Sequence, residues 1–320
     1  MKLGALKRYF IDEYVKDKEL TPFQKNRITF DLLSIRLDYE ASPLFIDYIK
    51  KHRIEVEKFV DALDDESKLE MTTILDNLNY MSAHSLDEAI KKFFMRGTYT
   101  LEHLDNMEII KQTYPLPTDM YEESIFKYKH GLVYVPDRAI NSIEHKDFLD
   151  CGAYMGESAL MFEKDYDPRK IYSFEPVPDN YNHLLENIKL NNLKKIVPVD
   201  KGVGESSKRV RYNFLDVTSY ISENGKSEMD IVSIDEFVEK NNLNIGLIKM
   251  DIEGYELPAL NGARKTIKKF KPVLLISIYH HPEELFKTKY HIEEIMQGYE
   301  YRIKLLADIR PLAEIHLIAW

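Results

Sequence analysis

One loop constrains the fold of this chain more than any other segment. The run Phe148-Leu-Asp-Cys-Gly-Ala-Tyr-Met-Gly-Glu-Ser158 begins as an apolar strand, turns at two glycines and continues into a helical pattern. Because glycine lacks a Cβ atom, Gly152 and Gly156 let the backbone turn sharply and approach a ligand. A second short strand ends in Glu175. A carboxylate at this place in a doubly wound fold accepts hydrogen bonds from ribose hydroxyls, so the pattern indicates a nucleoside-binding strand, turn and helix.

The order of acids and glycines favours one kind of nucleoside. A dinucleotide site uses the turn Gly-x-Gly-x-x-Gly, which places a pyrophosphate on backbone N–H groups. Here the order is Asp-x-Gly-x-x-x-Gly with an acid on either side, and these acids would repel a pyrophosphate. They suit the sulfonium, ammonium and ribose of S-adenosylmethionine, with Asp150 ordering the amino-acid end and Glu175 the sugar. An ordinary strand-to-helix turn with incidental glycines is the alternative.

Composition limits the class of protein. The 320 residues suggest about two domains, and 44% hydrophobic with 31% charged residues indicate a soluble globular chain. The net charge of −10 argues against nucleic acid or an anionic membrane as the main partner. A single cysteine, Cys151, excludes an intramolecular disulfide and fits a reducing compartment. With no signal-peptide pattern and no membrane span, we expect a cytoplasmic protein.

The first third of the chain has almost no helix breakers. Residues 1–96 contain one glycine and two prolines, and apolar residues recur at helical spacing, so we expect a helical N-terminal domain over residues 1–112. Asp64 should open one of its helices, and the stripe of Met71, Ile74, Leu75 and Leu78 should face the core. A homodimer face through these N-terminal helices is the alternative for such a stripe.

The remaining residues, 113–320, alternate apolar strands with helical stretches, which indicates a parallel α/β sheet. Helices are expected over Ser158–Lys164 and Asn180–Asn191, a β-hairpin within 207–232, and antiparallel pairing for the last two strands because only a loop joins them. We expect strands at Phe148–Cys151, Ile171–Glu175, Ile196–Val199, Leu247–Ile252, Val273–Ile278, Tyr301–Leu306 and Ile315–Ala319. The predicted fold is therefore α/β, with the mostly parallel seven-stranded, Rossmann-like sheet of class I methyltransferases and an antiparallel last strand.

A second charged segment lies near a strand end. Gly246-Leu-Ile-Lys-Met-Asp-Ile-Glu-Gly254 puts Lys249 and Asp251 on one face of a strand and Glu253 at its carboxyl end, where open α/β sheets bind ligands. Lys249 and Asp251 could instead neutralise one another. The next strand leads to His280, and an imidazole of near-neutral pKa at this edge would suit a general base, although a capping or structural histidine is also possible.

These motifs together resemble the FkbM family of S-adenosylmethionine-dependent methyltransferases. The resemblance covers about residues 125 to 320, and Lys249-x-Asp-x-Glu-Gly-x-Glu256 is its most specific part. It implies methyl transfer to a hydroxyl, commonly on a sugar, glycolipid or polyketide. The cofactor-binding positions that it implies, with weaker support at Lys201 for the adenine, are Asp150, Gly152, Ala153, Gly156, Glu157, Ser158, Glu175, Lys201 and Asp251.

The leading hypothesis is an O-methyltransferase that acts on a sugar, glycan or related small molecule. His280 would take the hydroxyl proton, Asp251 would orient the acceptor or the histidine, and Lys249 would tune that carboxylate. Glu253 is the second choice as base. Asp251, Glu253 and His280 could bind a divalent ion, but their spacing does not require one, so no metal is expected. The alternatives are an NAD-dependent oxidoreductase acting on a nucleotide sugar and a non-catalytic cofactor-binding scaffold.

Overall fold

The computed structural model describes residues 19–94, 100–215, 218–221, 225 and 227–320. These residues belong to two compact units. Unit 1 comprises Met1–Phe126 together with Leu305–Glu314, and unit 2 comprises Lys127–Lys304 together with Ile315–Trp320. The predicted domain boundary at residue 112 stays a prediction.

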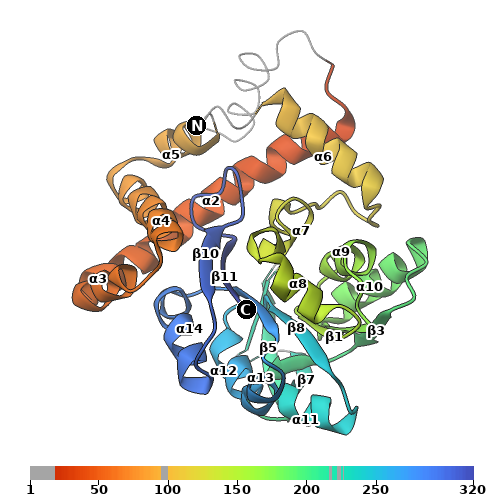
Figure 1. Cartoon of the computed structure of the whole chain (residues 1–320). Coiled ribbons are helices and arrows are strands. Elements are labelled where there is room, and N and C mark those ends of the chain that lie inside the picture. Colours follow the sequence, from red (N-terminus) through yellow and green to blue (C-terminus); the bar gives the residue numbers. More distant parts are fainter. Residues whose placement is uncertain (1–18, 95–99, 216–217, 222–224, 226) are drawn as a thin grey trace. The chain divides into compact units, whose positions relative to one another are not determined.

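Unit 1 is helical, as predicted (Figure 1). Thr21 and Gln24 form a capping box at the start of α2, and Asp64 caps α4 by accepting hydrogen bonds from two backbone N–H groups. The predicted apolar stripe is largely buried: Met71, Ile74 and Leu78 are at most 1% exposed. The helices are α2 (Pro22–Lys51), α3 (Arg53–Asp61), α4 (Asp65–Ala83), α5 (Leu86–Phe94), α6 (Leu101–Thr113) and α7 (Glu123–Phe126).

A loop from the far end of the chain completes unit 1. Asp38 on α2 accepts hydrogen bonds from the backbone N–H groups of Leu312 and Ala313, both at 3.1 Å, and pairs with Arg310 at 3.0 Å. Asn77 on α4 donates to the carbonyl of Pro311 at 3.1 Å. Residues 305–314 are therefore held by buried polar contacts with the helices of their own unit.

Unit 2 is built on a seven-stranded sheet of order β10-β11-β9-β8-β1-β2-β3. Its central pairs are parallel, whereas β11 runs antiparallel to β9, which confirms the predicted fold class. Every residue of β1, β8, β9 and β11 is buried. The strands are β1 (Asp147–Cys151), β2 (Lys170–Phe174), β3 (Ile196–Val199), β8 (Ile245–Met250), β9 (Val273–Ser277), β10 (Tyr301–Leu305) and β11 (Ile315–Ala319).

The helices of unit 2 follow the strands as a doubly wound sheet requires. The predicted helices after β1 and β2 are present, extended at their first turns. Five strands differ from their predicted bounds, four of them by one residue at one or both ends. The fifth, β8, differs by two residues at each end: it ends at Met250 and leaves Asp251 in the loop that follows. The helical segments are η2 (Lys129–Tyr134), α8 (Asp137–Ile143), α9 (Glu157–Asp165), α10 (Pro178–Leu190), α11 (Ile234–Lys240), α12 (Glu256–Asn261), α13 (Arg264–Phe270) and α14 (Pro282–Ile295).

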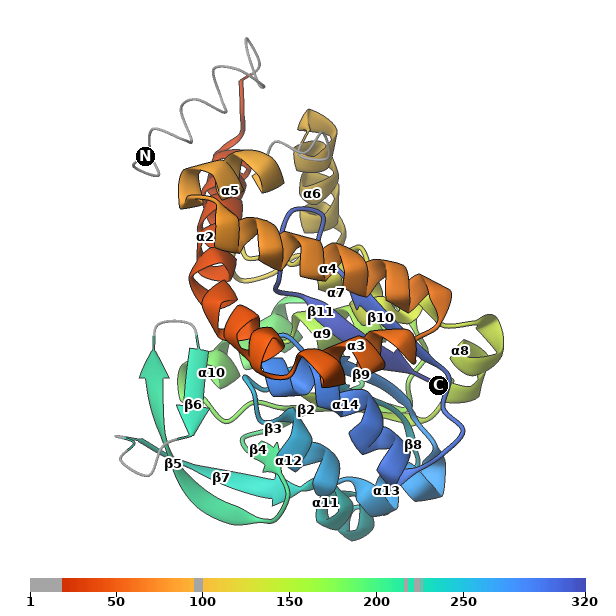
Figure 2. The same ribbon diagram turned by 90° about the vertical axis from the view of Figure 1, so that its left-hand side faces the viewer.

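A second, smaller sheet occupies the region where one hairpin was predicted (Figure 2). It consists of β4 (Gly202–Gly204), β5 (Lys208–Leu215), β6 (Thr218–Ile221) and β7 (Ser227–Ser233), in the order β4-β7-β5-β6. The antiparallel β5–β6 pair is the expected hairpin; β7 then extends it and also pairs parallel with β4. Tyr212, Met229 and Ile231 bury its inner face against Val177.

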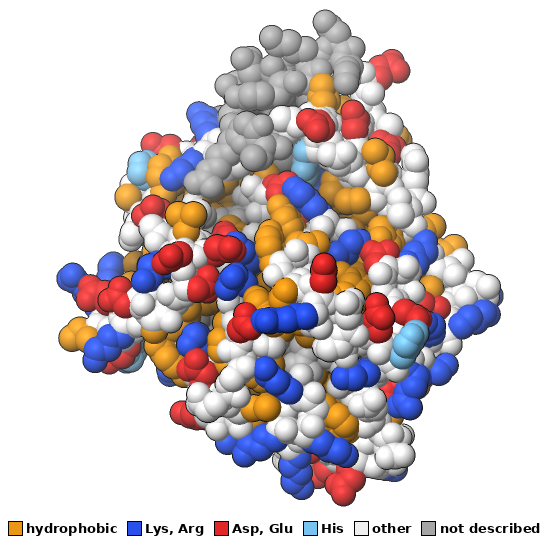
Figure 3. All heavy atoms as spheres, in the orientation of Figure 1, with side chains coloured by type: hydrophobic (Ala, Val, Ile, Leu, Met, Phe, Trp, Pro, Cys, Tyr) orange, Lys and Arg blue, Asp and Glu red, His pale blue; other side chains and the backbone are white. Residues whose placement is uncertain are grey.

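The described helices include none that is both long enough and apolar enough to cross a membrane. On the face shown in Figure 3, Lys and Arg side chains lie beside Asp and Glu side chains over the described residues.

Candidate functional site

The predicted site residues follow neighbouring strands along one edge of the sheet. In the order β3, β2, β1, β8 and β9, the carboxyl ends of the strands lead to Lys201, Glu175, Gly152, Asp251 and His280. Parallel strands place such ends at the same edge, so these residues lie along one edge of the sheet.

The glycine loop is folded tightly against the sheet. Gly152 and Gly156 adopt φ values of +77° and +83°, and the N–H groups of Gly152 and Ala153 both donate to the carbonyl of Phe174. A Cβ atom on Gly152 would lie 1.8 Å from the carbonyl oxygen of Asp251, and one on Gly156 would lie 2.5 Å from Leu184 Cδ1. Both glycines are thus required by the packing of protein segments, in addition to the turn that the sequence predicted.

Asp150 and Lys249 form a buried pair beneath this loop. Their side chains are 0% and 3% exposed, and Lys249 Nζ lies 3.3 Å from Asp150 Oδ1. Lys249 Nζ also donates to the carbonyl oxygen of Gly152 at 2.6 Å, while Ser173 Oγ donates to Asp150 Oδ2 at 3.4 Å. Burial alone would lower the pKa of Lys249, but the charges of Asp150 and Asp251 outweigh it and raise this pKa. The ammonium group therefore ties β1 to β8 and fixes the glycine turn.

Two further carboxylates hold the loop from its other side. Glu175 accepts hydrogen bonds from the N–H groups of Tyr154 and Val177, both at 2.9 Å. Glu157, at the first turn of α9, accepts from the N–H of Met155 at 3.1 Å. Burial raises the pKa of Glu175 to about 7 and that of Glu157 to about 8. The side chain of Asn180 donates a third hydrogen bond to Glu175. A carboxylate has about four lone-pair sites, so Glu175 could still accept a hydrogen bond from a ribose hydroxyl.

Carboxylates surround His280 on both edges of its ring. Its Nε2 atom lies 3.4 Å from Asp251 Oδ1 and 3.6 Å from Glu253 Oε2, while its Nδ1 atom lies 3.3 Å from Glu256 Oε1 and 3.9 Å from Glu284 Oε2. We refer to these five residues as the acid–histidine cluster. Glu256 and Glu284 are almost fully buried, whereas Asp251 and Glu253 are 25% and 39% exposed. The more accessible acids therefore face Nε2.

This environment changes the protonation of His280. Burial would lower its pKa, but the charge and hydrogen bond of Glu256, helped by Asp251 and Glu253, raise it to about 10. This raised pKa contradicts the expectation of a near-neutral imidazole and favours the imidazolium form of His280 at neutral pH. Glu284 has a pKa raised to about 9, through burial and its hydrogen bond with Glu256, and is protonated there.

The cluster also offers ligand atoms to a cation. Asp251, Glu256 and His280 each contribute one atom, and these atoms lie within 4.8 Å of one another. Of the three, Glu256 replaces the predicted Glu253. One oxygen of Glu256 already accepts a hydrogen bond from the N–H of Ile252 at 2.8 Å.

Sequence reasoning missed several partners of the site. Tyr279 Oη donates to Asp251 Oδ1 at 3.4 Å, and His130 Nε2 lies 2.7 Å from the hydroxyl of Ser158, a predicted cofactor residue. The motif containing Glu256 was recognised, but its pairing with His280 was not. His130 carried no signal, because it lies in a helical turn outside every motif and reaches Ser158 only through tertiary packing.

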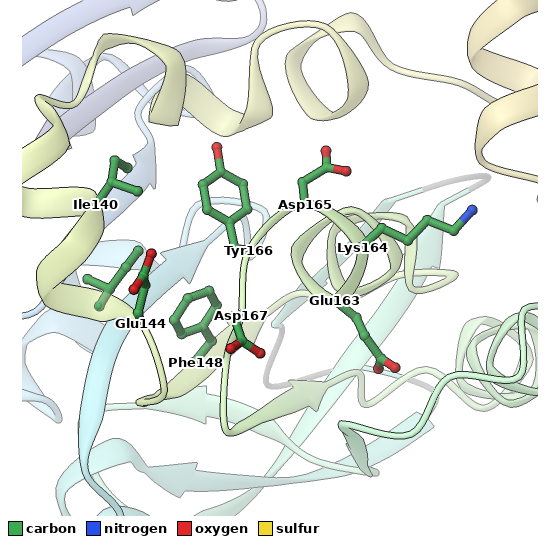
Figure 4. Close-up of a pocket in the computed structure, with 9 residues that line it drawn as sticks. Ile140, Glu144, Phe148, Glu163, Lys164, Asp165, Tyr166 and Asp167 are labelled. Carbon is green, nitrogen blue, oxygen red and sulfur yellow. The ribbon is translucent and has the colours of Figure 1, made fainter.

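A pocket of about 410 Å³ lies away from this edge (Figure 4). Its lining includes Phe148, near the first residue of β1, and the end of α9 with the two residues that follow it, so it is at the opposite end of the strand from the glycine loop. Three of its four acids are already engaged: Asp165 pairs with Lys129, Asp167 pairs with Lys195, and Glu163 accepts the N–H groups of residues 194 and 195. We therefore place the candidate site at the carboxyl edge.

The sheet order and the charged loops along its carboxyl edge define a class I methyltransferase domain. Within it, residues 150–303 match the family model described as "Methyltransferase FkbM domain". This part of the chain is therefore an FkbM methyltransferase domain, as the sequence motifs predicted.

Two comparisons measure how similar the chain is to known proteins in sequence and in fold. Hexuronic acid methyltransferase AglP of Haloferax volcanii is 25% identical over 142 residues, which cover 42% of this chain and 58% of that protein. A crystal structure of methyltransferase FkbM from Methylobacillus flagellatus KT is similar with a TM-score of 0.58 at 22% identity, covering 86% of this chain and 60% of that one. The chain thus spans less than two thirds of either relative, and the structural likeness concerns the fold alone.

Proposed function

We propose that this chain transfers a methyl group from S-adenosylmethionine to a hydroxyl of a sugar or glycan. The observation that carries the proposal is the contact between the glycine loop and the acid–histidine cluster: the N–H of Asp251 donates to the carbonyl of Cys151 at 3.0 Å. A cofactor on the loop would thus lie beside groups able to handle a hydroxyl proton. The similarity to AglP, which is named a hexuronic acid methyltransferase, supports a sugar acceptor.

The residues around the loop suit this cofactor. Glu175 would hold a ribose hydroxyl through its remaining lone pair, and the segment around Lys201, after β3, would lie against the adenine. Asp150 is fully buried, so its role would be indirect, through Lys249 and the carbonyl of Gly152. When bound, the cofactor would supply a methyl group on a positively charged sulfur, and the excess of acids in the cluster favours that charge.

The proton of the acceptor hydroxyl needs a base. His280 was predicted for this role, but its imidazolium already carries the proton that it would have to accept. We therefore assign the proton to the carboxylate of Asp251, which is partly exposed and accepts a hydrogen bond from Tyr279. His280 would orient Asp251 from 3.4 Å and stabilise its charged form, and Glu253 remains the second choice as base.

Ligand binding tests the cofactor assignment. In a thermal-shift comparison, S-adenosylhomocysteine should raise the melting temperature and NAD should not. Glu175→Gln should weaken S-adenosylhomocysteine on the order of tenfold in calorimetry, because one carboxylate oxygen becomes a donor. A shift with NAD alone would replace the proposal by the oxidoreductase.

Turnover tests the chemistry. With isotopically labelled methyl donor and a panel of hexuronic acid and neutral glycosides, label should enter a product that is stable to mild alkali, as an ether is. Asp251→Asn should reduce kcat on the order of 100-fold with cofactor affinity retained, and His280→Ala should also reduce it. His145→Ala is the matched control, since His145 is exposed and bonds to Asp167 at the opposite edge of the sheet. An alkali-labile ester would contradict hydroxyl methylation, and cofactor binding without turnover on any acceptor would favour the scaffold.

A further inference from the structure

A second group of metal-type ligands lies in unit 1, apart from every residue assigned to methyl transfer. It consists of His103 on α6, Glu123 at the start of α7 and Asp308 in the loop 305–314. Three segments distant in sequence thus meet at one point. We propose that these three residues bind a divalent first-row metal ion such as Zn²⁺.

The spacing of the donor atoms fits such an ion. His103 Nδ1 lies 3.1 Å from Glu123 Oε1 and 3.9 Å from Asp308 Oδ2, and the three donor atoms are within 4.8 Å of one another. Two ligands about 2.1 Å from a tetrahedral zinc ion are about 3.4 Å apart. Small side-chain rotations would therefore bring all three donors to bonding distance.

Burial and charge also favour a dication. The side chains of His103 and Glu123 are 6% and 3% exposed, and that of Asp308 is 16% exposed. A protonated imidazole would offset only one of the two carboxylates, whereas a dication bound to neutral His103 offsets both. Glu123 Oε1 is buried and receives no hydrogen bond from the described residues.

The two arginines nearby also pair with other acids. Arg27 pairs with Asp31 at 2.8 Å, and Arg310 pairs with Asp38 at 3.0 Å and with Glu314 at 3.5 Å. Glu123 and Asp308 thus add two acids to a region where Asp31, Asp38 and Glu314 already pair with these two arginines. A bound cation would relieve the repulsion between the acids.

Surrounding hydrogen bonds orient the ligands before any ion binds. The N–H of Asp308 donates to Glu123 Oε2 at 2.7 Å, which leaves Oε1 directed at the histidine. Thr100 caps α6 and accepts the N–H of His103 at 3.3 Å. The ion would thus clamp the loop 305–314 to α6 and α7, with water completing its coordination.

Zinc binding to the full-length protein tests the proposal. After treatment with EDTA and dialysis, the protein should take up one equivalent of Zn²⁺, measured by equilibrium dialysis with elemental analysis, and its melting temperature should rise. His103→Gln should weaken this binding on the order of 100-fold. His280→Gln, in the acid–histidine cluster, is the matched control and should keep the stoichiometric ion. Less than about a tenth of an equivalent in the wild type, or loss of the ion in His280→Gln alone, would overturn the assignment.

A spectroscopic variant covers the case in which His103→Gln does not fold. Asp308→Cys retains a metal-binding side chain, so Co²⁺ should give this variant a thiolate-to-cobalt charge-transfer band. The wild type should lack the band, because its single cysteine, Cys151, is buried in β1 of unit 2. Absence of the band in folded Asp308→Cys protein would also refute the site.

Discussion

Replacing Gly152 by alanine should disrupt unit 2 far more than the same change at Gly298. Both glycines have positive φ values, +77° and +90°, which cost an alanine about 1 to 2 kcal/mol. At Gly298 no atom of the described residues, its two chain neighbours apart, lies within 4 Å of the added Cβ, so this conformational cost is the main effect. At Gly152 the Cβ would lie 1.8 Å from the carbonyl oxygen of Asp251, so β1 and the loop after β8 must separate.

The separation of β1 from the loop after β8 explains why Gly152→Ala should lose more stability than Gly298→Ala. It weakens the bond from the N–H of Asp251 to Cys151 and the bond from Lys249 to Gly152, each contributing about 0.5 to 1.5 kcal/mol. Together with strain from overpacking, Gly152→Ala should lose about 3 to 5 kcal/mol of unfolding free energy, against about 1 to 2 kcal/mol for Gly298→Ala.

Urea denaturation followed by tryptophan fluorescence measures the difference. Trp320 is the only tryptophan of the chain and is buried in unit 2, so its emission reports on that unit. Calorimetry with S-adenosylhomocysteine should in parallel show lost affinity for Gly152→Ala and retained affinity for Gly298→Ala. Equal destabilisation of the two variants would refute the packing argument.

Three other outcomes follow from buried charges. Lys249→Met should destabilise unit 2 by about 3 to 5 kcal/mol, because the buried carboxylate of Asp150 loses its partner. Adding Asp150→Asn should restore part of this stability in the same fluorescence assay. If the double variant is no more stable than Lys249→Met, the two residues are not a coupled pair. The pKa of His280 is raised to about 10, so its imidazolium form exists below that pH and is lost above it. If Asp251 is the base, kcat/KM should therefore stay constant through neutral pH and fall near pH 10. A rise of kcat/KM toward pH 10 would instead identify neutral His280 as the base. Asp38→Asn should destabilise unit 1 by about 3 to 5 kcal/mol, measured by the helical circular dichroism signal. Arg36→Ala removes an exposed ion pair and should cost less than about 1 kcal/mol. Similar losses of stability in the two variants would contradict the anchoring role of Asp38.

Local patterns predicted most of the fold of unit 2. The strand ending near Cys151 and the strand Ile196–Val199 are short apolar runs between turn residues, and parallel topology then placed their carboxyl ends together. Asp64 was correctly identified as a helix start, since its side chain bonds to N–H groups only two and three residues away. Such features depend on neighbours in sequence.

Features that depend on distant residues were not predictable in this way. The sequence offered Asp251 as a partner for Lys249, but the structure adds Asp150, which lies on the adjacent strand. Burial lowers the pKa of His280 and the charge of Glu256 raises it, and Glu256 reaches the ring from α12, which follows another strand. The loop 305–314 carried no pattern that linked it to the N-terminal helices. In each case the pairing is specified by tertiary packing, which periodicity does not encode.

The division of unit 1 between two stretches of chain has a consequence for its synthesis. The helices up to Phe126 leave the ribosome first, but Asp38 and Asn77 receive their partners in residues 305–314 only after Lys127–Lys304 has been made. During most of translation the side chains of Asp38 and Asn77 therefore lack these hydrogen-bond partners. We expect the nascent chain to depend most on chaperones during this interval.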